Sequence, residues 1–529
     1  MSAFTKRALL GLSISTIVLS GCLSGGSSNS SAPAPTPPEQ TAACPTKGST
    51  PEGARTQQRL IDDCYYRVAW ATDEDGRLIA DATDPGFPDN VAGVKRWSGV
   101  LNRAGYRIEV PDNWNGQLVM WAHGFRGPGP DLTIDNPPMR AKLLEMGYAW
   151  AASSYSANAY DVKAGVEDTN RLALNFSSIT NLEEPDKLFI AGFSMGGHVA
   201  GAAIENDNRT VLRAADLDVS YSAALPMCGV MGDTTLFDYF GAYTTALLNL
   251  GDEAATSMPV EDAEERLARV RAKLWTNYAA NKSAAGLTED GLALVPLLQN
   301  LTGGTRPVYQ YSFGEFQDLL QGFTGSDGTI DGILVDRVSD TRYIAYRFTS
   351  PQLQPNMPED PYTANLSPFE TFFNDNIVRI SPVEGANGPR GADNLRWIPK
   401  IEGDFDVPVL TIHGLGDLFV PISMQQIYRK RAEANGNGNL LVQRAIRAPG
   451  HCDFTVDEIN EAFEDLIDWE NAISQNPNTA TRPDGDDLLD ASLVAQDDFG
   501  CQFTRLDRLQ FPPGFPVPSL PRCDSFSPQ

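Results

Sequence analysis

The sequence is poor in basic residues and in histidine. The first shortage argues against anionic partners, and the second argues against a metal site. It has 41 lysines and arginines against 68 aspartates and glutamates, a formal net charge of −27. Nucleic acids and anionic membrane surfaces require basic patches, so we expect neither as a direct electrostatic partner. The 7 cysteines include no C-x-x-C pair and the 4 histidines form no cluster, so no metal or other cofactor is expected.

The first 22 residues are typical of an export signal. Lys6 and Arg7 precede an apolar run, Ala8–Leu19, that is too short to span a bilayer and is followed by Ser-Gly-Cys22. This segment resembles a bacterial lipoprotein signal, in which cleavage before Cys22 leaves that residue lipid-modified. A plain secretory signal is the alternative. We therefore predict a cell-envelope protein, attached to the outer membrane or cell surface only by its N-terminal lipid, or a secreted protein.

Six other cysteines remain, and an even number in an exported chain suggests three disulfides. They are Cys44, Cys64, Cys228, Cys452, Cys501 and Cys523. Closing the shortest loops pairs the first two and the last two, which leaves Cys228 for Cys452. Cysteine spacing alone leaves other pairings open.

The stretch around Ser194 carries the strongest chemical signal. Leu188–Ala191 is typical of a short buried strand, and a helix of small residues follows the pattern Gly192-Phe-Ser-Met-Gly196. A strand that reverses into a helix within one turn strains the residue between them, and side chains in place of these glycines would collide with the neighbouring element. The serine hydroxyl would stand at a helix N-terminus, where developing negative charge is stabilised. The pattern predicts that Ser194 is a nucleophile.

Alternating strands and helices predict an α/β fold with a mostly parallel, doubly wound sheet. Besides the strand before Ser194, the expected strands are Tyr65–Ala71, Gly105–Val110, Gln117–Ala122, Met146–Ser153, one near Leu217–Leu225, Val407–His413 and Leu440–Ile446. The expected helices include Thr56–Asp63, Glu261–Asn281, Ile422–Ala434 and Thr455–Ile473. The alternation disappears between Met227 and Trp397, which predicts a large inserted cap or lid domain. Most aromatic residues of Arg306–Phe373 would form the core of the cap, and a few would form an apolar roof over the substrate.

These features divide the chain into six parts. They are a lipoprotein signal peptide (1–21), a Ser/Pro-rich tether (22–43), the first part of the core (44–228), the inserted cap (229–400), the second part of the core (401–473) and a C-terminal surface tail (474–529). Two acidic turns, Asp73–Gly76 and Ser326–Gly332, lack the ligand spacing of a defined calcium site, and turn chemistry explains them better.

A serine nucleophile needs a histidine base, and the base needs an acid to hold its tautomer. His451 is the one histidine in a loop after the last core strand, so we predict that it is the base. The other three are His123 at a strand end, His198 on the helix after Ser194, and His413 at the start of a turn. Asp417 follows the strand that ends at His413 and is the predicted acid; Asp453 is an alternative.

The order Ser194, Asp417, His451 along the chain is that of the α/β-hydrolases. The chain resembles this superfamily over residues 105–249 and 407–473. The matching motifs are His123-Gly124, Gly192-Phe-Ser-Met-Gly196, His413-Gly-x-x-Asp417 and Gly450-His451. The resemblance implies an acyl-enzyme mechanism with an oxyanion hole formed by the backbone N–H groups of Met195 and Phe125. The long separation of Ser194 from Asp417 independently favours an inserted cap.

A second, partial resemblance is to tannase and feruloyl-esterase-like enzymes. These enzymes have a cysteine directly after the catalytic histidine, as Cys452 follows His451 here. In them this cysteine pairs with one directly before the serine, where this chain has Phe193. Cys228 is a substitute partner for Cys452.

Ester hydrolysis is the predicted reaction, because export, surface anchoring and an aromatic-rich cap suit an esterase, lipase or polyester depolymerase acting on a small or polymeric ester. The alternative is a serine peptidase of the aminopeptidase type, which would grip a charged amino terminus with acidic cap residues such as Glu315, Asp318 or Asp336. A more remote alternative is an inactive surface binding protein on a hydrolase scaffold.

Overall fold

The computed structural model describes residues 66–71, 84, 87, 91–127, 129–253, 260–325, 338–348, 366–387, 395–505 and 523. All of them belong to one compact unit, Cys44–Gln529. Several predictions lie outside the described residues: the signal peptide and tether, Cys22, Cys44, Cys64, the helix Thr56–Asp63 and both acidic turns. Within the described part, no helix combines the length and the apolar character needed to cross a membrane.

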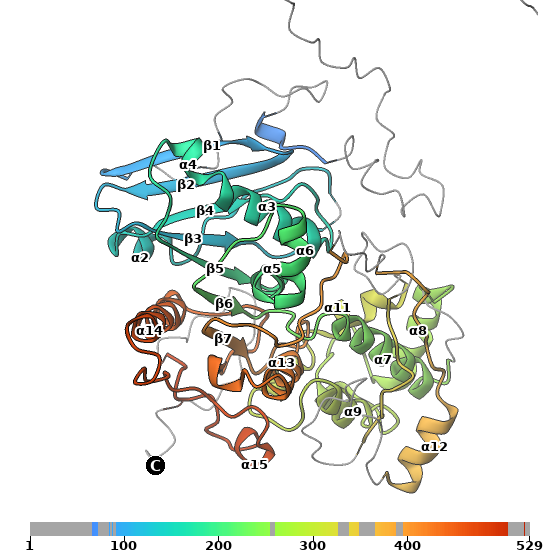
Figure 1. Cartoon of the computed structure of the whole chain (residues 1–529). Helices are drawn as coiled ribbons and strands as arrows, with labels where there is room; N and C mark the ends of the chain where they lie inside the picture. Colours follow the sequence, from blue (N-terminus) through green and yellow to red (C-terminus); the bar gives the residue numbers. More distant parts are fainter. Residues whose placement is uncertain are drawn as a thin grey trace, which may run out of the picture. The chain divides into compact units, whose positions relative to one another are not determined.

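The described strands form one eight-stranded sheet in the order β1-β2-β4-β3-β5-β6-β7-β8 (Figure 1). Their bounds are β1 Val94–Leu101, β2 Ala104–Pro111, β3 Gln117–Ala122, β4 Ala149–Ser153, β5 Lys187–Phe193, β6 Ala223–Met227, β7 Val409–Gly414 and β8 Leu441–Ile446. The pairs β1–β2 and β2–β4 are antiparallel, and all the other pairs are parallel. The predicted mostly parallel sheet is therefore confirmed.

Helices cover both faces of this sheet (Figure 1). Successive strand residues point to opposite faces, so Met120 belongs to a cluster with α3 and α5, whereas Trp121 belongs to a cluster with α2 and α14. The helices that follow the core strands are α2 Arg140–Glu145, α3 Val162–Leu174, α4 Phe176–Thr180, α5 Met195–Ile204, α6 Asn206–Ala214, α13 Ser423–Ala434 and α14 Val456–Gln475. The short elements η5 Gly438–Leu440 and α15 Ala491–Val494 lie near the C-terminal end. The arrangement is doubly wound, as predicted.

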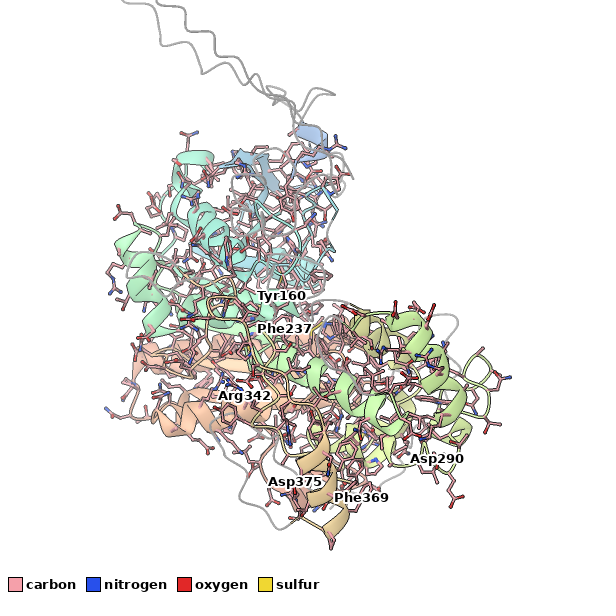
Figure 2. The ribbon with its side chains drawn as sticks, turned by 90° about the vertical axis from the view of Figure 1, so that its right-hand side faces the viewer. Tyr160, Phe237, Asp290, Arg342, Phe369 and Asp375 are labelled. Atoms are coloured by element: carbon pink, nitrogen blue, oxygen red, sulfur yellow. A yellow bond between two sulfur atoms is a disulfide. The ribbon has the colours of Figure 1, made fainter. Side chains whose placement is uncertain are left out.

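The chain between β6 and β7 is helical and lies to one side of the sheet (Figure 1). Its elements are α7 Thr235–Leu250, α8 Ala263–Leu274, η3 Ala284–Gly286, α9 Leu294–Leu301, α10 Tyr309–Ser312, α11 Gln317–Gly322, η4 Phe323–Gly325 and α12 Pro368–Asn376. We refer to these helices as the inserted segment. Its apolar residues join the same hydrophobic cluster as the α5 face of the sheet. At this junction the rings of Tyr160 and Phe237 meet edge-on at 5.2 Å (Figure 2).

Three predicted elements differ from the structure. The strand Tyr65–Ala71 is wrong, because Ala69–Ala71 forms a 3₁₀ turn (η2) and only Arg67 makes a bridge, to Asp131. The strand near Leu217 begins only at Ala223, since the N–H of Leu217 is bonded to Leu212 O at the end of α6. The predicted helix Glu261–Asn281 is the shorter α8, which stops where Trp275 adopts an extended backbone and bridges to Leu287.

Candidate active site

Ser194 stands in a strained turn between β5 and α5. Its backbone has φ 56° and ψ −119°, a region that side-chain-bearing residues rarely occupy. The turn is held from the next strand, since the N–H of Ser194 donates to Met227 O at 3.0 Å. A non-glycine residue in such a conformation indicates that the surrounding structure enforces it, which is typical of a functional site.

The glycines around Ser194 are required by close backbone contacts. A Cβ atom at Gly196 would lie 2.0 Å from Ala122 O, and one at Gly192 would lie 2.3 Å from Gly196 O. A Cβ at Gly197 would lie 2.6 Å from the Cα of Gly229. Only glycine lets α5 begin this close to the sheet, as the sequence pattern predicted.

The structure brings together the three residues that the sequence singled out. His451 Nε2 lies 2.8 Å from Ser194 Oγ, and His451 Nδ1 lies 2.5 Å from Asp417 Oδ2. The carboxylate is fully buried, and its Oδ1 accepts hydrogen bonds from the N–H groups of Phe419 (2.9 Å) and Val420 (3.0 Å). These two hydrogen bonds thus hold the carboxylate of Asp417 with its Oδ2 facing the imidazole. This geometry lets the ring donate from Nδ1 and accept the serine proton at Nε2.

The other three histidines are buried in structural contacts. His198 lies between Tyr160 Oη and Pro399 O, and His413 between Gln425 Nε2 and Val420 O. His123 contacts the backbone oxygens of Gly124 and Ser154. Burial lowers the pKa of each of the three to about 4, so they are neutral at pH 7.

The loop after β3 lies directly against the nucleophile. A Cβ atom at Gly124 would lie 3.4 Å from both Phe193 O and Ser194 Cβ. Tyr155 holds this loop: its hydroxyl donates to His123 O at 3.0 Å and its ring stacks on the His123 ring at 4.0 Å. This role of Tyr155 could not be predicted from the sequence, because no motif includes the residue.

Two aromatic side chains of the inserted segment pack against Phe419, whose ring contacts His451. Phe419, in the loop of Asp417, meets the His451 ring edge-on at 5.1 Å. Phe240 of α7 and Phe323 of η4 stack on each other at 4.2 Å and lie 6.0 and 6.1 Å from Phe419. Of the stretch Arg306–Phe373, most described aromatic residues are buried in packing, and Phe323 extends this cluster toward the site.

Three side chains from the chain between β6 and β7 also bond to the loops that carry Asp417 and His451. Tyr239 Oη donates to Leu418 O at 2.8 Å, Arg306 Nε to Leu415 O at 2.6 Å, and Ser312 Oγ to Pro449 O at 2.9 Å. Burial lowers the pKa of Arg306 to about 10. Sequence reasoning missed all three, because the contacts join residues more than a hundred positions apart and follow no local pattern.

Two of the predicted disulfides are present, Cys228–Cys452 and Cys501–Cys523. Met227 pairs with Phe193 across the strands β6 and β5, so Cys228 lies one residue beyond the position beside Phe193. The bond to Cys452 therefore ties the base loop to the strand next to the nucleophile instead of to the residue before the serine. Within the described residues, no group of three or more His, Cys, Asp and Glu side chains could hold a metal ion.

Comparison with known proteins gives distant relatives. No protein-family model matches the chain. The o-phthalyl amidase of Xanthobacter agilis is 23% identical over 453 residues, which cover 75% of this chain and 94% of the amidase. A solved esterase from Aspergillus oryzae is 11% identical with a TM-score of 0.38, covering 72% of this chain and 79% of that one. Feruloyl esterase B from Aspergillus oryzae is 14% identical with a TM-score of 0.34, covering 67% and 72%.

The sheet and the turn at Ser194 define the fold. The strand order, with Ser194 after β5, Asp417 after β7 and His451 after β8, is that of the α/β-hydrolase fold. This chain has the α/β-hydrolase fold, with a long helical segment between β6 and β7.

Proposed function

We propose that the protein is a serine hydrolase that cleaves carboxylic esters through an acyl-enzyme. The observation that carries the proposal is the continuous hydrogen-bonded series from Ser194 Oγ through His451 to the buried Asp417. A serine hydroxyl becomes a useful nucleophile when a histidine oriented by a carboxylate can accept its proton.

In the proposed mechanism, Ser194 Oγ attacks the substrate carbonyl while His451 Nε2 takes the hydroxyl proton. Asp417 stabilises the resulting imidazolium. The oxyanion accepts hydrogen bonds from the N–H groups of Met195 and Phe125, the first on the N-terminus of α5 and the second on the loop against Ser194. His451 then protonates the leaving alcohol, and water hydrolyses the acyl-enzyme by the same steps in reverse.

The surroundings of the triad support an apolar substrate. The rings of Phe240, Phe323 and Phe419 form an apolar cluster, and Phe419 contacts the His451 ring. Export to an oxidising compartment is part of the proposal: the two disulfides support it, as does the resemblance of residues 1–22 to a lipoprotein signal.

A second candidate is amide hydrolysis, favoured by the likeness to the o-phthalyl amidase. The same residues would serve, with His451 protonating a leaving amine. The aminopeptidase form of this idea has less support. Asp318 forms a surface ion pair with Lys282, Glu315 is exposed, and Asp336 lies outside the described residues.

The test uses the purified protein with p-nitrophenyl esters of increasing acyl length, beside benzoyl and free aminoacyl p-nitroanilides. We expect turnover of the esters, and Ser194→Ala should lower kcat by roughly 10³-fold or more. Turnover of benzoyl anilide at a comparable kcat/KM would replace the esterase with the amidase. Dependence on a free amino group would support the aminopeptidase.

Labelling with a fluorophosphonate separates all these enzymes from an inactive binding protein. An activated serine reacts at Ser194 and the Ser194→Ala protein does not. Absence of labelling in the folded wild-type protein would overturn the proposed function.

A further inference from the structure

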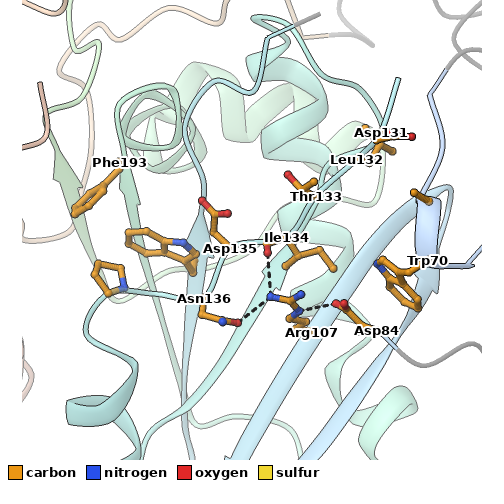
Figure 3. Close-up of a pocket in the computed structure, with 13 residues that line it drawn as sticks. Trp70, Asp84, Arg107, Asp131, Leu132, Thr133, Ile134, Asp135, Asn136 and Phe193 are labelled. Atoms are coloured by element: carbon orange, nitrogen blue, oxygen red, sulfur yellow. Dashed lines mark hydrogen bonds and ion pairs between the residues drawn. The ribbon is translucent and has the colours of Figure 1, made fainter. Parts of the chain in front are cut away.

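A cavity of about 780 Å³ opens beside the nucleophile turn, on the face of the sheet that α2 and α14 cover (Figure 3). Phe193, the residue before Ser194, lines one end and Trp70 the other, as Figure 3 shows. Thr133 and Ile134 of the loop before α2 lie over it, and Arg107 of β2 lies beneath them in this view. The triad described above does not use this cavity.

The register of the sheet explains why space remains there. Arg107 is paired with Ala152 of β4, and Trp121 of β3 is paired with both Ala152 and Ala191 of β5. These four residues form one row across the sheet with their side chains on the same face. Ala152 lies between Arg107 and Trp121 in this row, and its small side chain leaves room between them. Phe193 follows two residues after Ala191 on the same face, so the row leads directly to the nucleophile turn.

Arg107 brings a hydrogen-bond donor to this row. Its side chain is 7% exposed. Its Nε donates to Asp84 at 2.6 Å, and its Nη1 donates to Ile134 O (2.9 Å) and Asn136 Oδ1 (3.1 Å). Within the described part of the chain Nη2 has no partner, and no dashed line reaches it in Figure 3. The guanidinium is thus fixed on two sides with one donor group left for a ligand.

The carboxylates around the cavity are already neutralised. Asp84 pairs with Arg107, Asp131 with Arg67, and Asp135 with Arg126. A cationic ligand would therefore have to compete with an arginine for each of them, whereas an accepting oxygen would find the donor of Arg107 open.

The walls suit a planar apolar group. Trp70, Trp121 and Phe193 line the cavity, and the last two rings meet edge-on at 5.2 Å. Aromatic rings bury a large apolar area and bind other rings in stacked or edge-to-face contact.

We propose that this cavity binds an aryl group of the substrate that carries a hydrogen-bond-accepting oxygen, with the oxygen on Arg107 Nη2. The inference rests on the proposed function and specifies the substrate class of that site: esters with an aryl ring that carries an accepting oxygen in addition to the scissile carbonyl. Carboxylates and neutral carbonyls share the accepting oxygen, and the experiment separates them.

Binding is measured by calorimetry on the Ser194→Ala protein, with methyl benzoate, benzoate and toluene as probes. Methyl benzoate or benzoate should bind about tenfold tighter than toluene, the effect of one charge-assisted hydrogen bond. Thr133→Trp, which fills the cavity from an exposed loop position, should weaken binding of all three probes at least tenfold. The matched variant Thr133→Ser keeps the cavity open and should bind as the parent does.

Arg107→Lys keeps the charge opposite Asp84 but loses the planar fork of donors. It should remove the advantage of methyl benzoate over toluene, provided that circular dichroism shows an intact fold. Whichever of benzoate and methyl benzoate binds more tightly identifies the oxygen as carboxylate or carbonyl.

Turnover distinguishes failure of this inference from failure of the proposed function. With wild-type residues at the triad, Thr133→Trp should lower kcat/KM for phenyl 4-acetylbenzoate, whose ketone oxygen is separate from the scissile carbonyl, at least tenfold more than for ethyl acetate, which has no ring to place in the cavity. Equal binding of toluene and the oxygen-bearing probes, or an equal change in kcat/KM for the two esters in Thr133→Trp, overturns the inference. Tight binding of methyl benzoate without turnover of any ester or amide overturns the proposed function. It leaves the proposed binding role of the cavity standing.

Discussion

Cys452, the residue after His451, is disulfide-bonded to Cys228 at the end of β6, the strand that pairs with the strand of Ser194. Both cysteines have positive φ angles, 44° and 51°, so the chain turns sharply at each end of the bond. The disulfide thus joins the loop of His451 to the end of the strand that lies next to β5, the strand before Ser194. Its place suggests that it keeps the distance between these two groups.

Replacing both cysteines, Cys228→Ser with Cys452→Ser, should lower kcat about tenfold with little change in KM, because the His451 loop loses its tie to β6. The free energy of unfolding should fall by roughly 2–5 kcal/mol, as for other native disulfides. Kinetics with a p-nitrophenyl ester and thermal unfolding measure the two effects. The matched control is Cys501→Ser with Cys523→Ser, which opens the other described disulfide and should leave kcat unchanged. Equal kcat in both double variants would contradict a positioning role.

Tyr155→Phe should lower kcat about tenfold at nearly constant KM. Burial raises the pKa of Tyr155, so its hydroxyl stays protonated and donates to His123 O, the carbonyl that precedes the proposed oxyanion loop. Without that donor the loop against Ser194 is free to shift. The control is Tyr221→Phe, which removes another buried hydroxyl, bonded to Asn170 Oδ1 at 2.8 Å. A parallel loss of kcat in both variants would show that Tyr155 only stabilises the fold.

Asp417→Asn should lower kcat by roughly 10³–10⁴-fold, because an amide at this position can hold the wrong tautomer of His451. Asp453→Asn should change kcat less than twofold, since His451 Nδ1 faces Asp417. Steady-state kinetics of the two variants at one pH decide between the two acids. A larger loss of kcat in Asp453→Asn than in Asp417→Asn would identify Asp453 as the acid.

The sequence predicted the parts of the fold that depend on local pattern. Strands buried on both faces, such as β3 and β7, stand out as short apolar runs bounded by turns. The strand β1 was not predicted, because it pairs only with β2 and its residues are half-exposed, so its apolar pattern is weak. The run Tyr65–Ala71 has the composition of a strand, but its described residues 66–71 form a single bridge, at Arg67, which shows that propensity without a pairing partner does not make a strand.

The three residues of the candidate triad could be singled out because each follows a strand in the expected order. The contacts that support the loops of these residues could not be predicted from the sequence. Tyr239 and Arg306 act on backbone oxygens of a loop far along the chain, and any buried tyrosine or arginine could have such a role. Their function depends on how the inserted segment packs against the core, which the spacing of residues in one sequence does not reveal.

The buried histidines predict a loss of stability in mild acid. His198 is fully buried and its pKa is lowered from 6.5 to about 4, with desolvation as the main cause. Between these two pH values the unfolded chain binds a proton that the folded chain does not. Stability is therefore complete above pH 6.5 and falls as the pH drops toward 4. For His198 alone the loss between pH 8 and pH 5 is roughly 2 kcal/mol.

His198→Gln should reduce this pH dependence by that amount. Glutamine can accept from Tyr160 Oη and donate to Pro399 O, as the imidazole does, but it does not titrate. Urea unfolding of the two proteins at several pH values between 5 and 8 gives the difference in slope. A residual slope remains in the variant, because His123 and His413 also have lowered pKa values. Identical slopes in the two proteins would mean that His198 binds protons equally in the folded and unfolded states, which the donor Tyr160 at one ring nitrogen and the acceptor Pro399 O at the other argue against.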